Sequence, residues 1–152
     1  MYEFGFRSGG VIAMATAAAL GAYYLLDGSY PRDASVARAA DGHYWAVAEV
    51  NGAPVRFLVD TGSSMVALTR HDAARLGLEP APEDFRREVL TASGPARAAP
   101  VELSHVSVDG ARVERVEALV FEDGLHASLL GMSYLGRLSR IEATPSAITL
   151  RR

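Results

Sequence analysis

The sequence predicts a mainly β domain that follows a short apolar N-terminal segment. Two observations favour this class. From residue 42 onward, short strand-like runs alternate with tight turns, and two of those turns, Asn51-Gly52 and Asp109-Gly110, have the composition typical of two-residue hairpins. The runs also follow one another too closely for crossover helices between parallel strands. About 110 residues remain for this domain, which is enough for an independent core.

Each element is predicted from its own local pattern. Pro54 lacks a backbone N–H, so the strand after Asn51-Gly52 can hold it only at a sheet edge or at its first positions. Gly77 is a typical C-cap for the helical turns before it. A hairpin of small residues is expected around 92–95. The predicted strands cover residues 43–50, 55–59, 65–69, 88–91, 97–103, 101–108, 113–121 and 148–150, and the short helices cover 71–76 and 133–138.

Composition excludes several classes of function. The 152 residues carry a formal net charge of −3 and have a pI near 5.8, so no basic field is present to attract nucleic acid. Cysteine is absent, which excludes disulfides, thiolate metal sites and cysteine nucleophiles but leaves the compartment open. No glycine pattern for nucleotide binding occurs, and Ser64 lacks the flanking glycines of a serine hydrolase.

The histidines and the single tryptophan are interpreted as structural. His43, His71, His105 and His126 show no metal-ligand spacing, so each is expected to be a surface or structural residue. Trp45 and the tyrosines are expected in the core or in an interface. No cofactor and no metal site are therefore expected.

The N-terminal segment is long enough to cross a membrane. No charge occurs between Arg7 and Asp27, and roughly 19 uncharged residues would form a helix of about 28 Å, near the thickness of a bilayer's hydrocarbon core. A cleaved signal peptide is the alternative, because Ala17-Ala18-Ala19 resembles a cleavage site. The apolar run continues past those alanines, which favours an anchor over residues 1–27. Residues 28–41 are small, polar and charged, and are expected to form a linker.

Residues 57–64 are the strongest candidate for chemistry. Three apolar residues of strand character lead directly into Asp60, Thr61, Gly62 and Ser63. The Asp60 carboxylate should therefore lie at the rim of a buried sheet, partly desolvated yet accessible. Gly62 allows close backbone approach, and the hydroxyls can donate hydrogen bonds to the carboxylate and the loop. The alternative is a polar turn after a strand, since Asp-x-Gly turns are common.

Asp60-Thr61-Gly62-Ser63-Ser64 after an apolar strand resembles the active-site loop of the retropepsin-type aspartic proteases. Residues 42–59 and 129–135 resemble a bacterial branch of that family, in which one N-terminal membrane segment precedes a single protease domain. The similarity covers roughly residues 42–150. It implies a closed β-barrel of the acid-protease fold with one or two short helices, formed by residues 42–152. It also implies a single-pass protein of the inner membrane with the protease domain on the periplasmic side.

The resemblance implies roles for three groups of residues. The catalytic residue would be Asp60, and its loop would be supported by Thr61, Gly62 and Ser63. In the family a glycine-containing hairpin, the flap, covers the active site, and here it would be formed by Ala92, Ser93 and Gly94. An apolar pair followed by glycine packs behind the catalytic loop, and here it would be Leu129, Leu130 and Gly131.

The number of suitable carboxylates implies two chains. Peptide hydrolysis by this chemistry needs two Asp side chains that share one proton, and Asp-Thr-Gly occurs only once in the sequence. Two chains related by a two-fold axis could each contribute Asp60, with each Thr61 bracing the partner loop. We therefore expect a homodimeric aspartic endopeptidase acting on protein or peptide substrates, with the strand at 148–150 helping to form the interface.

Two other functions stay open. One is a catalytically inactive binding or sensing module of the same fold at the membrane. The other is an acid-based phosphotransferase, which fits less well because its motifs require a second acid or a lysine directly after the Asp, where this chain has Thr61.

Overall fold

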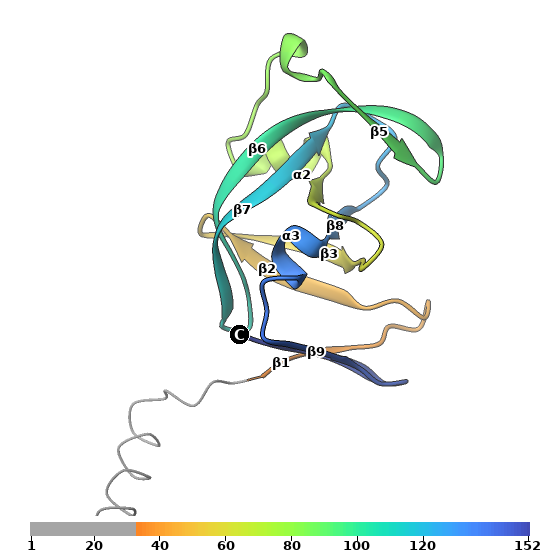
Figure 1. Ribbon diagram of the computed structural model, residues 1–152, viewed down its shortest axis with the longest axis vertical. Helices are drawn as coiled ribbons and strands as arrows, with labels where there is room; N and C mark the ends of the chain where they lie inside the picture. Colours follow the sequence, from red (N-terminus) through yellow and green to blue (C-terminus); the bar gives the residue numbers. More distant parts are fainter. Residues whose placement is uncertain (1–32) are drawn as a thin grey trace, which may run out of the picture. The chain divides into compact units, whose positions relative to one another are not determined.

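The computed structural model describes residues 33–152, which belong to one compact unit (Figure 1). The anchor or signal peptide expected over residues 1–27 lies outside the described residues, as does the first part of the expected linker. Within residues 33–152, no helix combines the length and the apolar character that crossing a bilayer requires.

Strands dominate the described residues, which confirms the prediction of a mainly β domain. The strands are β1 (Ala34–Ala37), β2 (Trp45–Val50), β3 (Ala53–Val59), β4 (Val66–Leu68), β5 (Arg87–Thr91), β6 (Gly94–Val108), β7 (Ala111–Phe121), β8 (Ser128–Leu130), β9 (Arg140–Ala143) and β10 (Ala147–Arg151). The helices are α2 (Arg70–Arg75), the 3₁₀ turn η1 (Pro82–Asp84) and α3 (Met132–Leu135). Both α-helices overlap the predicted helical segments, although α3 ends three residues before the predicted end at 138.

Six strands close into a barrel, as the resemblance implied. Hydrogen-bonded neighbours follow the order β2, β3, β8, β4, β7, β6, and the barrel closes because β2 also pairs with β6. This closing contact is short, with Glu49 opposite Ser107 and Val50 opposite Val106. In Figure 1, β6 and β7 form the long curved pair that runs from the lower to the upper part of the domain. Among the described strands, β5 pairs with β6 alone and extends the sheet beyond the barrel.

Two tight turns determine the register of the barrel hairpins. β2 and β3 pair directly around Asn51-Gly52, and β6 and β7 pair directly around Asp109-Gly110. All four turn residues have positive φ, which a type I′ turn needs and which Asn, Asp and Gly adopt most readily. Both hairpin predictions are therefore confirmed.

The two ends of the domain meet in a separate sheet of three strands. β10 is the central strand, with β1 on one side and β9 on the other, and both pairings are antiparallel. Arg151 at the end of β10 forms an ion pair with Asp33, which precedes β1. A hydrogen bond from the Arg151 guanidinium holds the pKa of Asp33 below its usual value. Backbone pairing and a charged contact thus join the two ends of the described chain.

This small sheet differs from the sequence-based expectation. Ala34–Ala37 falls in the expected linker, and only its pairing with β10 reveals it as a strand, because four small residues carry little local signal. β9 was not predicted. Residues 148–150 were expected to help form the interface on the premise that a strand near a chain end has an unpaired edge. That premise is wrong, because both edges of β10 are already paired within the chain. Among the described residues, no strand pairs with the outer edge of β1 or of β9 in this sheet.

The barrel interior holds the main hydrophobic core. Buried and exposed residues alternate along β2, as the two-residue period of a strand requires. Phe57, Leu130 and Tyr134 are among the largest fully buried side chains. The Tyr134 hydroxyl donates to Ala111 O at 2.6 Å, and burial raises the pKa of Tyr134 to about 12. Tyr134 therefore anchors α3 against the start of β7.

Candidate active site

Strand β8 determines where Asp60 lies, because β8 is inserted between β3 and β4. β3 runs parallel to β8, with Val59 opposite Leu130. The chain leaves β3 at Asp60 and enters β4 on the other side of β8, so residues 60–65 must cross the end of β8 (Figure 1). The Asp60 segment is therefore a short loop across the end of a buried strand.

Backbone hydrogen bonds attach this loop to the chain around the end of β8. Asp60 N donates to Leu130 O at 3.2 Å, and Met132 N donates to Ser63 O at 2.8 Å. Within the loop, Ser63 N donates to Asp60 O at 3.3 Å. The backbone that carries the carboxylate is thus held from both sides.

The Asp60 carboxylate is half-buried, and each of its oxygens accepts one hydrogen bond. Gly62 N donates to Oδ1 at 2.9 Å, and Ser63 Oγ donates to Oδ2 at 2.9 Å. These two donors determine the orientation of the carboxylate. Because an ionised carboxylate offers about four acceptor positions, each oxygen keeps one for a water molecule or a second carboxyl group.

Gly131 is required for steric reasons. Its φ of −96° is one that any residue can adopt. A Cβ at this position, however, would lie 2.1 Å from Met65 O and 2.8 Å from Ser63 O. The Asp60 loop therefore packs directly on the backbone of Gly131, and no side chain fits between them.

The hairpin of β5 and the first part of β6 occurs where the flap was predicted. The two strands pair around a two-residue turn, Ala92-Ser93, with Thr91 opposite Gly94. Thr91 Oγ1 donates to Gly94 O at 2.7 Å and accepts from Ser93 N at 3.2 Å. Gly94 has a φ of 114°, so glycine is needed at this position.

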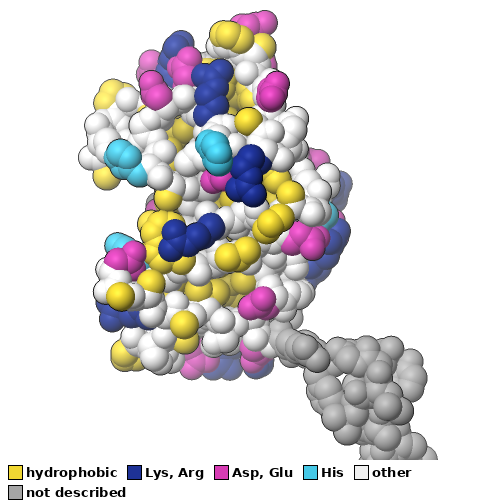
Figure 2. All heavy atoms as spheres, turned by 180° about the vertical axis from the view of Figure 1, so that it is seen from behind, with side chains coloured by type: hydrophobic (Ala, Val, Ile, Leu, Met, Phe, Trp, Pro, Cys, Tyr) yellow, Lys and Arg dark blue, Asp and Glu magenta, His cyan; other side chains and the backbone are white. Residues whose placement is uncertain are grey.

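A cleft of about 690 Å³ is lined by both this hairpin and the Asp60 loop. Its buried wall comes from a small hydrophobic cluster that includes Ala67, Leu119 and Phe121. Leu90 of the hairpin also lines the cleft and is 85% exposed. Of the described residues that line the cleft, Asp60 is the only acidic one. In Figure 2 this side of the domain, at the left, shows a notch bordered by hydrophobic side chains.

The structure places all ten predicted site residues in or next to this cleft. Those that line it are Asp60, Gly62, Ser63, Ala92, Ser93 and Leu129. Thr61 is exposed beside Asp60, and Gly94 belongs to the hairpin turn. Leu130 is fully buried behind the loop, next to Gly131.

The residues that line the cleft without having been predicted to do so include His43, Trp45 and His126. Trp45 was interpreted as a core or interface residue, yet it is half-buried on the cleft wall. Hairpin register could have shown this, because a two-residue turn at Asn51-Gly52 places Trp45 opposite Leu58, directly before the loop. His126 comes from the connection between β7 and β8, whose path has no local sequence signal.

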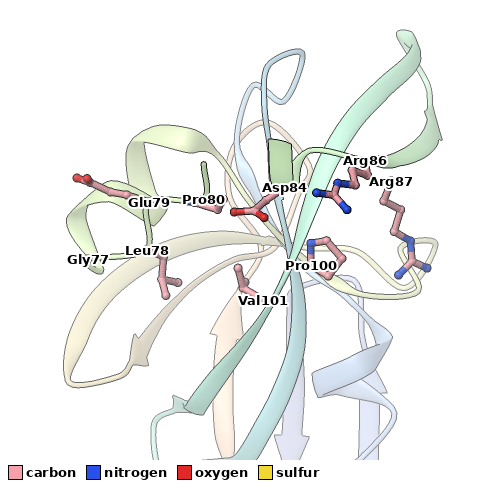
Figure 3. A pocket seen from close by; sticks show the side chains of 9 residues that line it. All are labelled: Gly77, Leu78, Glu79, Pro80, Asp84, Arg86, Arg87, Pro100 and Val101. Carbon is pink, nitrogen blue, oxygen red and sulfur yellow. The ribbon is translucent and has the colours of Figure 1, made fainter. Parts of the chain in front are cut away.

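A second hollow, of about 670 Å³, lies between the connection from α2 to β5 and strand β6 (Figure 3). None of the ten predicted site residues lines it. Two of its charged groups bind nearby backbone: Asp84 Oδ2 accepts from Ala81 N at 2.9 Å, and Arg86 Nε donates to Glu83 O at 2.5 Å. Figure 3 shows the Glu79 carboxylate pointing away from it. The cleft at Asp60 is therefore the candidate active site.

The Asp60 carboxylate is a group in the cleft that could act as a general acid or base. Within residues 33–152, no group of three His, Cys, Asp or Glu side chains is placed to hold a metal ion. The closed barrel, the Asp-Thr-Gly loop across a buried strand and the hairpin beside it together define a retropepsin-like fold. The profile of the aspartyl protease family matches residues 46–134, and the chain belongs to this family.

Solved structures of similar fold include two proteases. The chain is 36% identical to a retropepsin-like aspartic protease from Rickettsia conorii, with a TM-score of 0.70 over 78% of this chain and 98% of that one. The EIAV protease in complex with an inhibitor is 18% identical, with a TM-score of 0.52 over 64% of this chain and 88% of that one, and this likeness shows the fold alone.

Two curated relatives are uncharacterised proteins. One, from the cobV 5′ region of a Sinorhizobium species, is 41% identical over 73% of this chain and 48% of its own length. The other, from Rickettsia prowazekii, is 41% identical over 67% of this chain and 44% of its own length. The chain thus spans about half the length of the curated relatives it matches.

Proposed function

We propose that the protein is an aspartic endopeptidase in which two copies of Asp60, one from each chain of a homodimer, activate the water that hydrolyses a peptide bond. The observation that carries this proposal is the Asp60 carboxylate, oriented by Gly62 N and Ser63 Oγ in a cleft with a hydrophobic wall. The similarity to the Rickettsia conorii protease supports the same class of activity.

The proposed reaction uses one proton shared by two carboxyl groups, because two like charges so close cannot both ionise. The ionised Asp60 takes a proton from water, and the water oxygen bonds to the scissile carbonyl carbon. The protonated Asp60 gives its proton to the carbonyl oxygen. Breakdown of the tetrahedral intermediate breaks the C–N bond. The Asp60 that took a proton from water gives it to the leaving amine, and the other Asp60 takes a proton from a hydroxyl of the intermediate, which leaves a carboxylic acid and restores the shared proton. The apolar walls of the cleft favour substrates with apolar side chains next to the scissile bond.

The second carboxylate must come from another chain in this proposal. Thr61 and Gly62 are exposed at the tip of the loop, so the loop is accessible to a partner. A partner strand could join the three-stranded sheet at the outer edge of β1 or β9 without displacing an existing pairing. We propose that Asp60 meets its counterpart across a two-fold axis, with each Thr61 bracing the partner loop.

We also propose that residues 1–27 anchor the protein in the inner membrane, with the protease domain in the periplasm. The uncharged stretch between Arg7 and Asp27 supports an anchor. Anchoring would confine both chains to one plane and raise their effective concentration.

Activity should depend on protein concentration. A fragment comprising Arg32–Arg152, which keeps β1 in its sheet, should dimerise weakly, because no anchor concentrates it. Its specific activity on a peptide library should fall on dilution, in parallel with the dimer fraction measured by sedimentation over the same series. A strictly monomeric fragment with full activity would refute the two-chain site. A dimer that cleaves no peptide would instead favour the inactive binding module.

The pH profile of cleavage should be bell-shaped with an optimum on the acid side of neutral. Its two macroscopic pKa values would belong to the pair of Asp60 carboxyl groups, since they share one proton. The neighbouring Asp41 should not cause the acid limb. Hydrogen bonds from His43 N and from the Trp45 indole lower the pKa of Asp41, so its carboxylate stays ionised until the pH falls below its usual range. A rate that rises steadily through about pH 9 would contradict a shared-proton pair.

A further inference from the structure

The wall of the cleft continues onto the outer face of the β2–β3 hairpin. Trp45 and Val47 of β2 share this face with Arg56 and Leu58 of β3, because they form the cross-strand pairs Trp45–Leu58 and Val47–Arg56. Trp45 and Leu58 line the cleft, and Val47 is 60% exposed. A substrate chain leaving the cleft on this side would therefore pass over Arg56 and Val47.

Arg56 lies on the tryptophan at the cleft rim. Its guanidinium carbon is 3.9 Å from the centroid of the Trp45 ring, a close cation–π contact. Within residues 33–152, the Arg56 guanidinium has no ion-pair or hydrogen-bond partner, although its charge makes a small contribution to lowering the pKa of Asp41. A stacked guanidinium keeps its planar fork of N–H donors, which matches a carboxylate with two parallel hydrogen bonds.

Asp41 holds the indole in place. Trp45 Nε1 donates to Asp41 Oδ2 at 2.8 Å, and His43 N donates to Asp41 Oδ1 at 2.9 Å. Each oxygen of Asp41 is thus bound to this segment of the chain. Trp45 is therefore fixed at its edge by Asp41 and on one face by Arg56, which gives a pre-organised binding surface.

We propose that Arg56, stacked on Trp45 at the rim of the cleft, binds an acidic side chain of the substrate. This inference rests on the proposed function. It assigns the substrate class as peptides with an apolar segment at the scissile bond and an Asp or Glu further along the chain. At the rim, the substrate carboxylate would meet the Arg56 cation. It would avoid the cleft interior because the Asp60 carboxylate lies there, the only acidic group among the described residues that line the cleft.

The binding test uses the full-length chain with Asp60→Asn, so that peptides bind without being cleaved. Trp45 is the only tryptophan in the sequence, so its fluorescence reports directly from the proposed subsite. The probes are tryptophan-free peptides with an apolar centre, in which a single Glu or Gln is moved along the chain. At one position, the Glu peptide should bind about fivefold more tightly than its Gln counterpart, the range expected for an exposed charge pair, and the preference should weaken with salt.

Matched variants locate the effect. Arg56→Gln should remove the preference for Glu, and Arg56→Lys should keep part of it, because the charge remains and the planar fork is lost. Arg70→Gln is the control, since it removes the same charge from a guanidinium that also lies over an aromatic ring, that of Phe85, and neither Arg70 nor Phe85 lines the cleft. Arg70→Gln should leave the preference unchanged. For the wild type, kcat/KM should likewise be higher for the Glu peptide than for its Gln counterpart at that position.

The outcomes separate this inference from the protease itself. If the Glu and Gln peptides bind equally at every position and both are cleaved, the proposed Arg56 subsite is overturned and the proposed protease function stands. If binding shows a preference for Glu that depends on Arg56, but the wild type cleaves no peptide, the proposed subsite stands and the proposed protease function is overturned. If Arg56→Gln changes sedimentation but not the preference, Arg56 belongs to a contact between chains, and the subsite is overturned.

Discussion

Replacing Asp60 with Asn should abolish peptide cleavage while leaving the fold nearly intact. The amide cannot share a proton with the partner carboxyl group, so kcat should fall by at least about a thousandfold. The local hydrogen bonds can survive, because the Asn oxygen can accept from Gly62 N and its NH₂ can donate to Ser63 Oγ. Peptide digestion and thermal unfolding of the purified variant measure the two effects separately.

Asp109→Asn is the matched control for this substitution. Asp109 lies in the turn between β6 and β7 with a φ of 44°, a conformation that Asn also adopts readily. The same chemical change there should leave cleavage unchanged. Mixing wild type with excess Asp60→Asn should also suppress activity, because mixed dimers would carry one defective carboxyl group. Full proteolysis by pure Asp60→Asn would rule out the aspartic-protease mechanism.

Gly131→Ala should damage both stability and activity. The added Cβ would lie 2.1 Å from Met65 O and 2.6 Å from Met65 C, and these backbone atoms cannot rotate away as a side chain could. The loop must therefore move, which strains the hydrogen bond from Met132 N to Ser63 O. We expect a loss of about 2–3 kcal/mol in the free energy of unfolding, measured by denaturant titration. Activity should fall further than stability explains, because the Asp60 carboxylate is displaced.

Gly77→Ala separates this clash from the general effect of replacing a glycine. Gly77 has a φ of +72°, and a Cβ there would meet no atom within 4 Å. The substitution should cost about 1 kcal/mol from backbone strain alone and should leave kcat/KM unchanged. If Gly131→Ala proved as stable and as active as Gly77→Ala, the loop would not need to pack on the Gly131 backbone.

The sequence determined the hairpins and the position of the Asp60 loop, because their signals are local. Asn51-Gly52 and Asp109-Gly110 adopt positive φ wherever they occur in a two-residue turn, so both the turns and the pairing around them follow directly. Asp60 after an apolar run is placed at the end of a strand by the same local reasoning. The contribution of Gly131 was implied by family resemblance, and the steric reason for it is visible only in the fold.

Tertiary structure decided the features that depend on contacts between distant parts of the chain. β8 lies between β3 and β4, an order that no local pattern encodes, and this order forces the Asp60 loop across the Gly131 backbone. Ala34–Ala37 becomes a strand only because β10 supplies its hydrogen bonds, and this pairing leaves β10 without an open edge. Trp45 lies on the cleft wall because closure of the barrel brings the flap hairpin and the connection after β7 to the same side as the β2–β3 hairpin. Local propensity determines turns and strand ends, whereas the neighbours of each strand are selected by burial of the whole core.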